Sequence, residues 1–505
     1  MLMKTRYEKV KFFRRRQFIL GPDYIHYEEW HKIKIDDYHF ITVHPDLRFT
    51  QLEENKNKAI LLGYFLDPLS PESTDKDILS RFLDKRISVE NTILKLENLC
   101  GRFVLIIKSH DNLWLFHDAC GLRQVHYCSD KSKNIWVASQ PGLLAQLLGF
   151  NYDEEMISYR NLSIFVSGRD EFWFPHTRTP FKEVKYLLPN HYLDLSTGEV
   201  YRFWPKKGSF ENLAFDECLD LTADLLKNTI KAATMRFDVK MGISAGCDSR
   251  KSLAAAREVK NKICFFTHTP NKGSEADMEI PSRLLPKLGL EHNKIRLEQM
   301  DNGFRYYYEL NNTWPRERHG NIAYSIMKYF GTEAVILNSN ISEYSGIWYW
   351  LPKNKITAKN LAMLRLLKNH MVIREFDKWL NGAALSCESA KMNVLVLFDL
   401  ELRSRWVSQA LAEYDIAFET FNPYNNRYLF RLELSVNERI RQGRSLYMPK
   451  KLIEKMWPEA LLLPINPEKH IIGKMKKVLN NRVFFPIIRN IRYLRAKWIF
   501  SRLSS

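Results

Sequence analysis

The residues best suited to chemistry form one short run, S-A-G-C-D-S-R, at residues 244–250. Serine hydroxyls and the backbone amides near Gly246 can donate hydrogen bonds to an anion. Ala245 and Gly246 are small enough to let a ligand approach the backbone closely. Asp248 supplies a carboxylate that can hold a magnesium ion against phosphate oxygens. The run therefore has the composition of a phosphate-binding loop.

The elements predicted on either side would place this run where ligands bind. Residues 239–244 form an apolar run of strand length, and residues 248–259 have a helical pattern. Backbone amides in the first turn of a helix converge on an anion, and ligands of open parallel sheets bind beyond the carboxyl ends of the strands. A helix capped by Asp248 or Ser249, with no ligand, is the competing interpretation.

Beyond residue 211 the sequence alternates strand and helix patterns, which predicts a parallel sheet with crossover helices. The further helices and strands expected there are residues 215–235, 263–267, 276–288, 294–297 and 334–337. Residues 17–150 contain mainly short apolar or alternating runs, which predicts a layered, mostly antiparallel domain. Its clearest strands are residues 58–65, 102–108, 113–117 and 135–138.

The loop resembles the S-G-G-x-D-S pyrophosphate loop of the asparagine synthetase family. Residues 338–343 follow an apolar strand where the family has S-G-x-G-x-D-E, and residues 421–426 are similar to its late P-[FY]-x-D segment. Landmarks of the family's glutaminase domain are similar to residues 101–103, 118–121, Tyr127 and residues 138–139. The resemblance covers most of residues 58–470, and the order of its motifs makes it specific.

The resemblance implies an α/β protein with two main domains. Residues 1–170 would form a class II glutamine-amidotransferase-like α+β sandwich. Residues 171–212, which hold four prolines, would form a linker. Residues 213–470 would form a PP-loop synthetase domain, a parallel α/β fold like that of adenine nucleotide α-hydrolases, with C-terminal helices. Residues 471–505 would form a basic amphipathic tail.

The resemblance also assigns roles to single residues. ATP would lie with its pyrophosphate on the loop and its adenine against the neighbouring strand ends. The implied ATP-binding residues are Ile243, Ser244, Ala245, Gly246, Asp248, Ser249, Thr267, Asn338 and Ser339. Asp248 and Glu343 would hold Mg²⁺, and Glu343 and Arg250 would take part in catalysis. Glu343 and Glu333 are the candidates for the base that accepts a proton from the amine.

The implied reaction is an ATP-dependent amide ligation. A carboxylate would attack the α-phosphate of ATP, and ammonia or an amine would then displace AMP from the acyl-adenylate. Relatives with an S-x-G-x-D-S-R loop resemble enzymes that modify surface polysaccharides or small metabolites, so we expect a small-molecule or glycan-linked carboxylate as substrate. The family's glutaminase needs a cysteine at residue 1, whereas here Leu2 follows the first methionine and the first cysteine is Cys100. We therefore expect no glutamine hydrolysis by that route.

The net charge of +18 lies mainly at the two ends of the chain. Residues 1–16 hold seven basic side chains and one acidic side chain, and residues 474–505 hold nine basic side chains and no acidic one. The apolar residues Ile487, Ile488, Ile491, Leu494 and Trp498 recur at helical spacing in the tail. Such a basic amphipathic helix either lies on an anionic membrane surface or packs on the protein itself.

Two alternatives remain open at this stage: a PP-loop enzyme that modifies RNA, and a non-catalytic scaffold that keeps the fold. The near-neutral middle of the chain argues against a nucleic-acid partner, and a homodimer is compatible with the sequence. Seven cysteines without a CxxC pair favour a cytoplasmic protein, at most peripheral at the membrane. Arg316, Arg318 and His319 either meet a carboxylate substrate or remain solvated loop charges.

Overall fold

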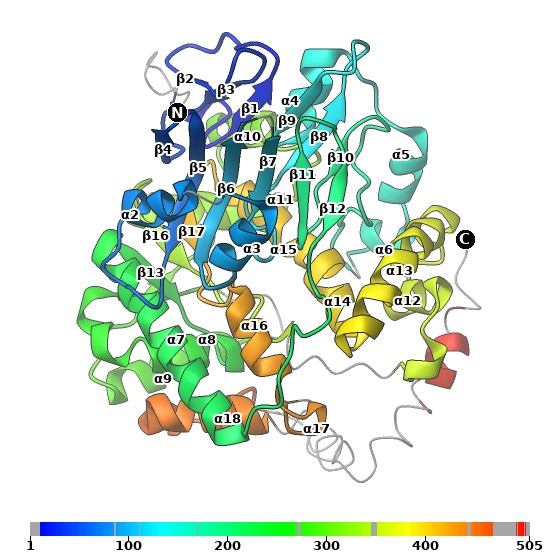
Figure 1. Ribbon diagram of the computed structural model, residues 1–505. Coiled ribbons are helices and arrows are strands. Elements are labelled where there is room, and N and C mark those ends of the chain that lie inside the picture. Colours follow the sequence, from blue (N-terminus) through cyan, green and yellow to red (C-terminus); the bar gives the residue numbers. More distant parts are fainter. Residues whose placement is uncertain are drawn as a thin grey trace.

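The computed structural model describes residues 11–84, 87–110, 112–168, 170–269, 274–344, 351–441 and 446–467, and in the tail residues 491, 493–498 and 500. Two antiparallel sheets form the first part of the molecule, and a parallel sheet with helices on both faces forms the second (Figure 1). The expected mixed α/β fold, with an antiparallel sandwich followed by a parallel α/β domain, is confirmed.

The antiparallel part is a sandwich of two six-stranded sheets. The first sheet has the order β10 (Lys185–Tyr186), β8 (His126–Ser129), β9 (Ile135–Ala138), β1 (Phe18–Gly21), β3 (Phe40–Val43) and β2 (His31–Lys34). The second has the order β12 (Val200–Arg202), β11 (His191–Asp194), β7 (Asn112–His117), β6 (Cys100–Ser109), β5 (Asn57–Leu66) and β4 (Phe49–Glu54). The four clearest strands expected from the sequence are all present.

Alternating side chains of the long strands build two separate cores. Ile60 and Ile106 face the first sheet, where they pack with residues such as Leu20. Their neighbours Leu61 and Leu105 face the opposite side. Two helices, α2 (Asp75–Ser80) and α3 (Val89–Glu97), cover that side. Because both faces of β5 and β6 are buried, their sequences are apolar without interruption.

The expected linker at residues 171–212 differs from the observed structure. It contributes β10, which pairs with β8, and β11, which pairs with β7; β12 pairs with β11 at the edge of the second sheet. Leu187, Leu193 and Leu195 from this segment lie in the core between the two sheets. Trp173 and Trp204 lie in the core shared with helices of the second part, so the segment packs against both parts.

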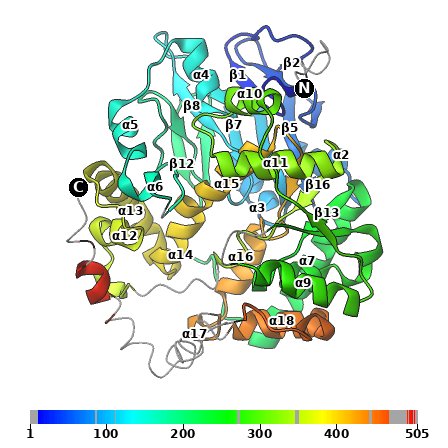
Figure 2. The same ribbon diagram turned by 180° about the vertical axis from the view of Figure 1, so that it is seen from behind.

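The parallel sheet has the strand order β15-β14-β13-β16-β17. Its strands are β13 (Val239–Gly242), β14 (Cys264–His268), β15 (Asn293–Ile295), β16 (Val335–Leu337) and β17 (Glu419–Phe421). On one face pack α7 (Phe215–Arg236), α8 (Cys247–Ala255) and α9 (Ala276–Lys287). On the other face pack α10 (Asn302–Asn311) and α11 (Glu317–Phe330), which lie toward the viewer in Figure 2.

Further helices lie in both parts. They are α4 (Pro141–Leu148), α5 (Glu154–Arg160) and α6 (Ser163–Val166) in the connection between the sheets, then α12 (Ala358–Leu364), α13 (His370–Ala390), α14 (Val394–Phe398), α15 (Ser404–Tyr414), α16 (Arg427–Leu434), α17 (Glu438–Arg441) and α18 (Tyr447–Met456). Among the described residues, we find no helix both long and apolar enough to cross a membrane.

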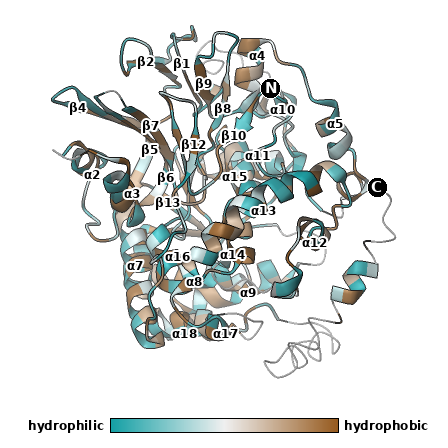
Figure 3. Ribbon diagram, turned by 45° about the vertical axis from the view of Figure 1, so that its right-hand side comes forward, coloured by the Kyte–Doolittle hydropathy of each residue, from teal (hydrophilic) through white to brown (hydrophobic). Residues whose placement is uncertain are grey.

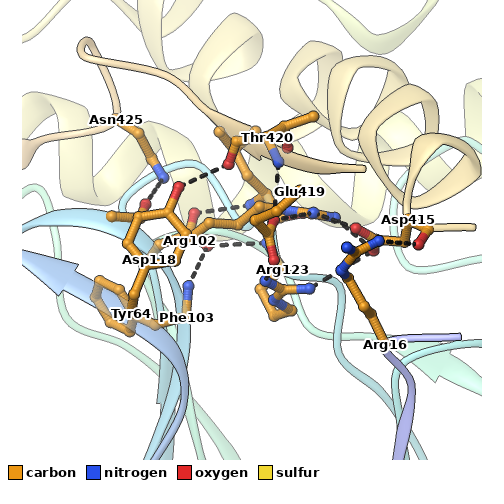
Figure 4. Close-up of polar contacts among 12 residues, drawn as sticks. Arg16, Tyr64, Arg102, Phe103, Asp118, Arg123, Asp415, Glu419, Thr420 and Asn425 are labelled. Atoms are coloured by element: carbon orange, nitrogen blue, oxygen red, sulfur yellow. Dashed lines mark hydrogen bonds and ion pairs between the residues drawn. The ribbon is translucent and has the colours of Figure 1, made fainter. Parts of the chain in front are cut away.

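A buried ion-pair network joins the two parts (Figure 4). Arg102 of β6 donates to Asp415 over 2.8 Å, and Arg123 donates to Glu419 of β17 over 2.6 Å. Both arginines are at most 2% exposed. Burial opposes ionisation of Glu419, but the two guanidinium groups hold the pKa of its carboxyl below the usual range. The sandwich is therefore fixed against the last strand of the parallel sheet.

The segment before β1 adds a second connection. Arg14, Arg15, Arg16 and Gln17 are all buried. Their side chains donate to Gln146 Oε1, to Asp46 Oδ2, to the carbonyls of Thr332, Asp415, Ile416 and Ala417, and to the carbonyl of Asn311. This part of the basic N-terminal segment thus serves internal packing rather than the surface.

Candidate functional site

A cavity of about 450 Å³ opens at the carboxyl ends of β13, β14 and β16. Eight of the nine residues expected to bind ATP line it: Ile243, Ser244, Gly246, Asp248, Ser249, Thr267, Asn338 and Ser339. The ninth, Ala245, lies in the same loop, where its N–H donates to Asp277 Oδ1 over 3.1 Å. The parallel topology brings together residues up to 96 positions apart because all three strands end at the same edge.

The N-terminus of α8 opens toward this cavity without a side-chain cap. The N-cap is Gly246, and no side chain caps the first-turn amides. Asp248 and Ser249 lie within the first turn, so neither is the N-cap residue. Uncapped first-turn amides at the positive end of a helix dipole form a site for an anion. The geometry therefore favours a ligand-binding loop over a helix that caps itself.

Hydrogen bonds inside the loop fix its shape. The N–H of Ser244 donates to Ser249 Oγ, and the N–H of Gly246 donates to Ser244 Oγ, each over 3.1 Å. The two serine hydroxyls are also 3.1 Å apart. Both hydroxyls therefore lie at the mouth of the helix, beside the cavity.

Asp248 connects the loop with the segment after β16. Its Oδ1 accepts a hydrogen bond from Ser342 Oγ, and Lys251 Nζ lies 3.9 Å away from the same oxygen. The ammonium of Lys251 also donates to the carbonyl of Ser342 over 2.7 Å, and its side chain is only 4% exposed. A buried cation thus lies next to the carboxylate of the loop.

A second cavity of about 290 Å³ lies on the other side of Asp248. Lys251, Ser342 and Glu343 contribute to its walls, and Asp248 lines both cavities. Glu343 forms an ion pair of 2.8 Å with Arg403 and keeps a side-chain exposure of 44%.

Asp248 and Glu343 line one cavity, where Asp248 accepts a hydrogen bond from Ser342 and Glu343 is paired with Arg403. Within the described residues, no group of three or more histidine, cysteine, aspartate or glutamate side chains could hold a metal by itself. Mg²⁺ generally uses only one or two protein carboxylates, with phosphate oxygens and water completing its shell. Asp248 and Glu343 are two carboxylates that such an ion could use.

Arg250 points away from both cavities. Its guanidinium donates to the carbonyl of Ala460 over 2.7 Å and to that of Leu463 over 3.1 Å. Burial lowers the pKa of Arg250 to about 10. Close by, the N–H of Asn466 donates to the carbonyl of Ala245 over 3.0 Å. In this position Arg250 holds the C-terminal segment against the phosphate loop.

Several residues of the site are not evident from the sequence. Ser252 Oγ lies 2.7 Å from Ser339 Oγ and 3.1 Å from the hydroxyl of Tyr424. Lys251 Nζ lies 4.9 Å from the centre of the Tyr424 ring. The positions of Lys251 and Ser252, three and four residues after Asp248, indicate a shared helix face. The resemblance of residues 421–426 to a family segment drew attention to this region, but no local pattern indicates that Tyr424, 176 positions from Asp248, reaches the loop.

The basic cluster of α11 is largely neutralised by carboxylates. Arg318 donates to Glu171 over 2.8 Å, His319 Nε2 lies 3.2 Å from the same carboxylate, and Arg316 donates to Glu413. The hydrogen bond from His319, together with the nearby arginines, lowers the pKa of Glu171 to about 2 against the opposing effect of burial. Arg318 and His319 nevertheless reach the wall of the 450 Å³ cavity.

Glu333, the other candidate base, lies outside the two cavities. Its side chain is 85% exposed and lies 3.7 Å from Lys11 Nζ. His292 Nε2 lies 2.9 Å from Thr267 Oγ1, which in turn donates to the carbonyl of Ile243. His292 therefore contacts a residue of the cavity wall without lining the cavity itself.

The cysteines offer no activated nucleophile. Burial raises the pKa of the thiol in all seven of them. A nucleophilic cysteine needs a lowered pKa, because the thiolate is the reactive form.

No family model and no curated protein matches the sequence. Among solved structures, glutamine phosphoribosylpyrophosphate amidotransferase from B. subtilis, complexed with ADP and GMP, is similar at 8% identity, with 73% of this chain and 76% of that chain covered and a TM-score of 0.24. A structure described as the allosteric regulatory enzyme of purine biosynthesis has 9% identity, coverage of 72% and 76%, and a TM-score of 0.25.

A third solved structure is the glutamine-dependent NAD⁺ synthetase from Acinetobacter baumannii in complex with ADP. The two sequences are 14% identical, the match covers 43% of this chain and 40% of that chain, and the TM-score is 0.20. TM-scores this low carry no information on the function of this chain, so its function rests on the cavities and their residues.

Proposed function

We propose that this protein is an ATP-dependent amide ligase that activates a carboxylate as its adenylate and transfers the acyl group to ammonia or an amine. One observation carries the proposal: eight of the nine residues expected to bind ATP line a single cavity into which the uncapped end of α8 opens. An anion site, a carboxylate and a buried cation lie within one helical turn of each other.

The cavity has a polar and an apolar side, as a nucleotide requires. Ser244, Ser249 and the amides at the start of α8 would hold the pyrophosphate. Phe266, Ile322 and Ile336 provide apolar lining, which suits the flat adenine ring. Hydrogen-bonding groups at the strand ends would orient the base.

Asp248 and Glu343 would hold Mg²⁺. When bound, that ion would neutralise phosphate charge during transfer. Lys251 supplies a further positive charge from the protein itself. Because it is buried next to Asp248, its effect on developing negative charge is larger than it would be in water.

The second cavity is the place we assign to the acyl substrate. It shares Asp248 with the first cavity, so that a carboxylate bound there would face the α-phosphate. Lys251 would attract the substrate carboxylate, and Leu446, Met448 and Leu452 would contact its body. Glu343 faces the same cavity and is the carboxylate we assign to accept the proton from the attacking amine.

Carboxylate-dependent exchange of pyrophosphate into ATP tests the proposal. We expect exchange with at least one acid in a panel of amino, sugar and aliphatic carboxylic acids. Asp248→Asn should lower the rate by at least about 10²-fold, as is typical when a group that stabilises transition-state charge is removed. Absence of exchange with every acid, together with absence of ATP binding, would refute the ligase and favour a scaffold that keeps the fold.

A further inference from the structure

One face of the C-terminal helix packs on the protein. Its described residues, 491, 493–498 and 500, are helical. Tyr493 packs against the main hydrophobic core, and Phe500 is only 5% exposed. Seven residues separate these two side chains, so they lie on the same face of the helix. The helix is therefore anchored on the body through this face.

The opposite face exposes large apolar side chains. Ile491, Leu494 and Trp498 are 59%, 63% and 56% exposed. Their spacing of three and four residues places them in one stripe, and a rotation of about 100° per residue places that stripe away from Tyr493. Figure 3 shows hydrophilic and hydrophobic bands alternating on this helix. A large apolar stripe in water usually marks an interaction surface.

Cations border the stripe on both sides. Arg495 and Lys497 are exposed, and the same rotation places them on either side of Leu494 and Trp498. Residues 474–505 contain nine basic side chains and no acidic one. An apolar stripe with a tryptophan, bordered by cations, matches a helix that lies in the headgroup region of an anionic bilayer.

We propose that the C-terminal helix docks this protein on an anionic lipid bilayer, with Ile491, Leu494 and Trp498 inserted among the lipids and basic side chains on the headgroups. The proposal rests on the exposed stripe and its charges and is independent of the ligase activity. Neither Leu494 nor its neighbours line the two cavities. Docking would thus place the enzyme at a surface without changing its chemistry.

Co-sedimentation of the full chain with vesicles tests this docking. We expect binding to phosphatidylcholine vesicles that contain phosphatidylserine, much weaker binding to pure phosphatidylcholine, and loss of binding at high salt. Leu494→Ser should weaken binding by about tenfold or more, because a buried leucine side chain contributes that much. The control Leu69→Ser, at a residue with 64% exposure in another part of the chain, should bind like the original protein.

Both substitutions replace exposed leucines, so both variants should unfold at the same temperature as the original chain. Arg495→Gln combined with Lys497→Gln should weaken binding at low salt by about tenfold or more. Equal binding of Leu494→Ser and Leu69→Ser would overturn the proposal. Failure to bind phosphatidylserine vesicles, or dimerisation through the helix in place of vesicle binding, would also overturn it.

Discussion

Lys251 and Asp248 form the charge pair on which the proposed chemistry depends most closely. The Lys251 ammonium lies 3.9 Å from the Asp248 carboxylate and donates to the carbonyl of Ser342. A buried cation held in place by its neighbours needs little reorganisation when negative charge develops. The pair therefore links the nucleotide side of the site to the acyl side.

Replacing Lys251 tests its role at the level of a single residue. Lys251→Met keeps the length of the side chain and removes its charge, so exchange of pyrophosphate should fall by about 10²-fold. Lys455→Met, at a partly exposed position of α18, serves as the control and should keep the original rate. An unchanged exchange rate in folded Lys251→Met would exclude the lysine from the reaction.

The ionisation of Glu171 makes the stability of the fold depend on pH in the acid range. Its carboxyl has an ordinary pKa of 4.5 and a pKa of about 2 in the folded chain. Because the folded state binds the proton more weakly, the contribution of Glu171 is complete above pH 4.5 and is lost as the pH falls toward 2. Glu171→Gln should flatten the fall in unfolding free energy over this range.

Denaturant unfolding of the two proteins between pH 5 and pH 2, a range set by the two pKa values, measures this difference. Glu454→Gln, at an exposed position of α18, is the control and should reproduce the original pH dependence. Identical slopes for Glu171→Gln and the original chain would show that the ion pairs with Arg318 and His319 do not stabilise the fold.

At the scale of elements, whether a strand could be predicted from the sequence depended on its length and on the burial of its faces. The strands β5 and β6 are buried on both faces, so their runs of apolar residues were evident. The strands β1, β3 and β8 have four residues each, too few to show a pattern of their own. The prolines around β10 to β12 favour a linker instead of strands in the sequence pattern. The alternation of strand and helix patterns predicted the parallel sheet. The helices between parallel strands show apolar residues at a 3.6-residue spacing, which differs from the pattern of the strands.

The contact between the two sheet systems was not predictable, because charged side chains in a sequence usually indicate a surface. Arg102 is instead 2% exposed between Asp415 and Glu419. Arg102→Met should lower the free energy of unfolding by about 3–5 kcal/mol, since it leaves two buried carboxylates without this partner. Denaturant titration measures the change.

A matched control is Arg283→Met, which removes an arginine from an ion pair with Glu279 whose two side chains are 58% and 55% exposed. This change should cost about 1 kcal/mol or less because both charges are largely in water. Equal losses for the two variants would show that burial of the network adds nothing to stability.

At the scale of the whole molecule, the charge has two separate roles. Arg14, Arg15 and Arg16 are buried between the domains, so part of the N-terminal basicity is structural. The exposed basic residues described in the tail border an apolar stripe. The phosphate loop was predictable from one local motif, whereas Lys251, Tyr424 and Asp277 joined the site only through folding.

The whole molecule should use ammonia or an amine and not glutamine. All seven thiols have raised pKa values, so no cysteine is activated for attack. Incubation with glutamine should release no glutamate, while free ammonia should support amide formation with an acid that gives exchange. Glutamate release at a rate matching amide formation would contradict this prediction and show that the first domain is an active glutaminase.

The most direct test of the proposed activation follows an oxygen atom. The acid that supports exchange is labelled with ¹⁸O in its carboxylate and incubated with ATP and ammonia. Attack of that carboxylate on the α-phosphate predicts one labelled oxygen in the AMP that is released with the amide. Label in inorganic phosphate, with ADP as the other product, would contradict adenylation at the Ser244–Ser249 loop.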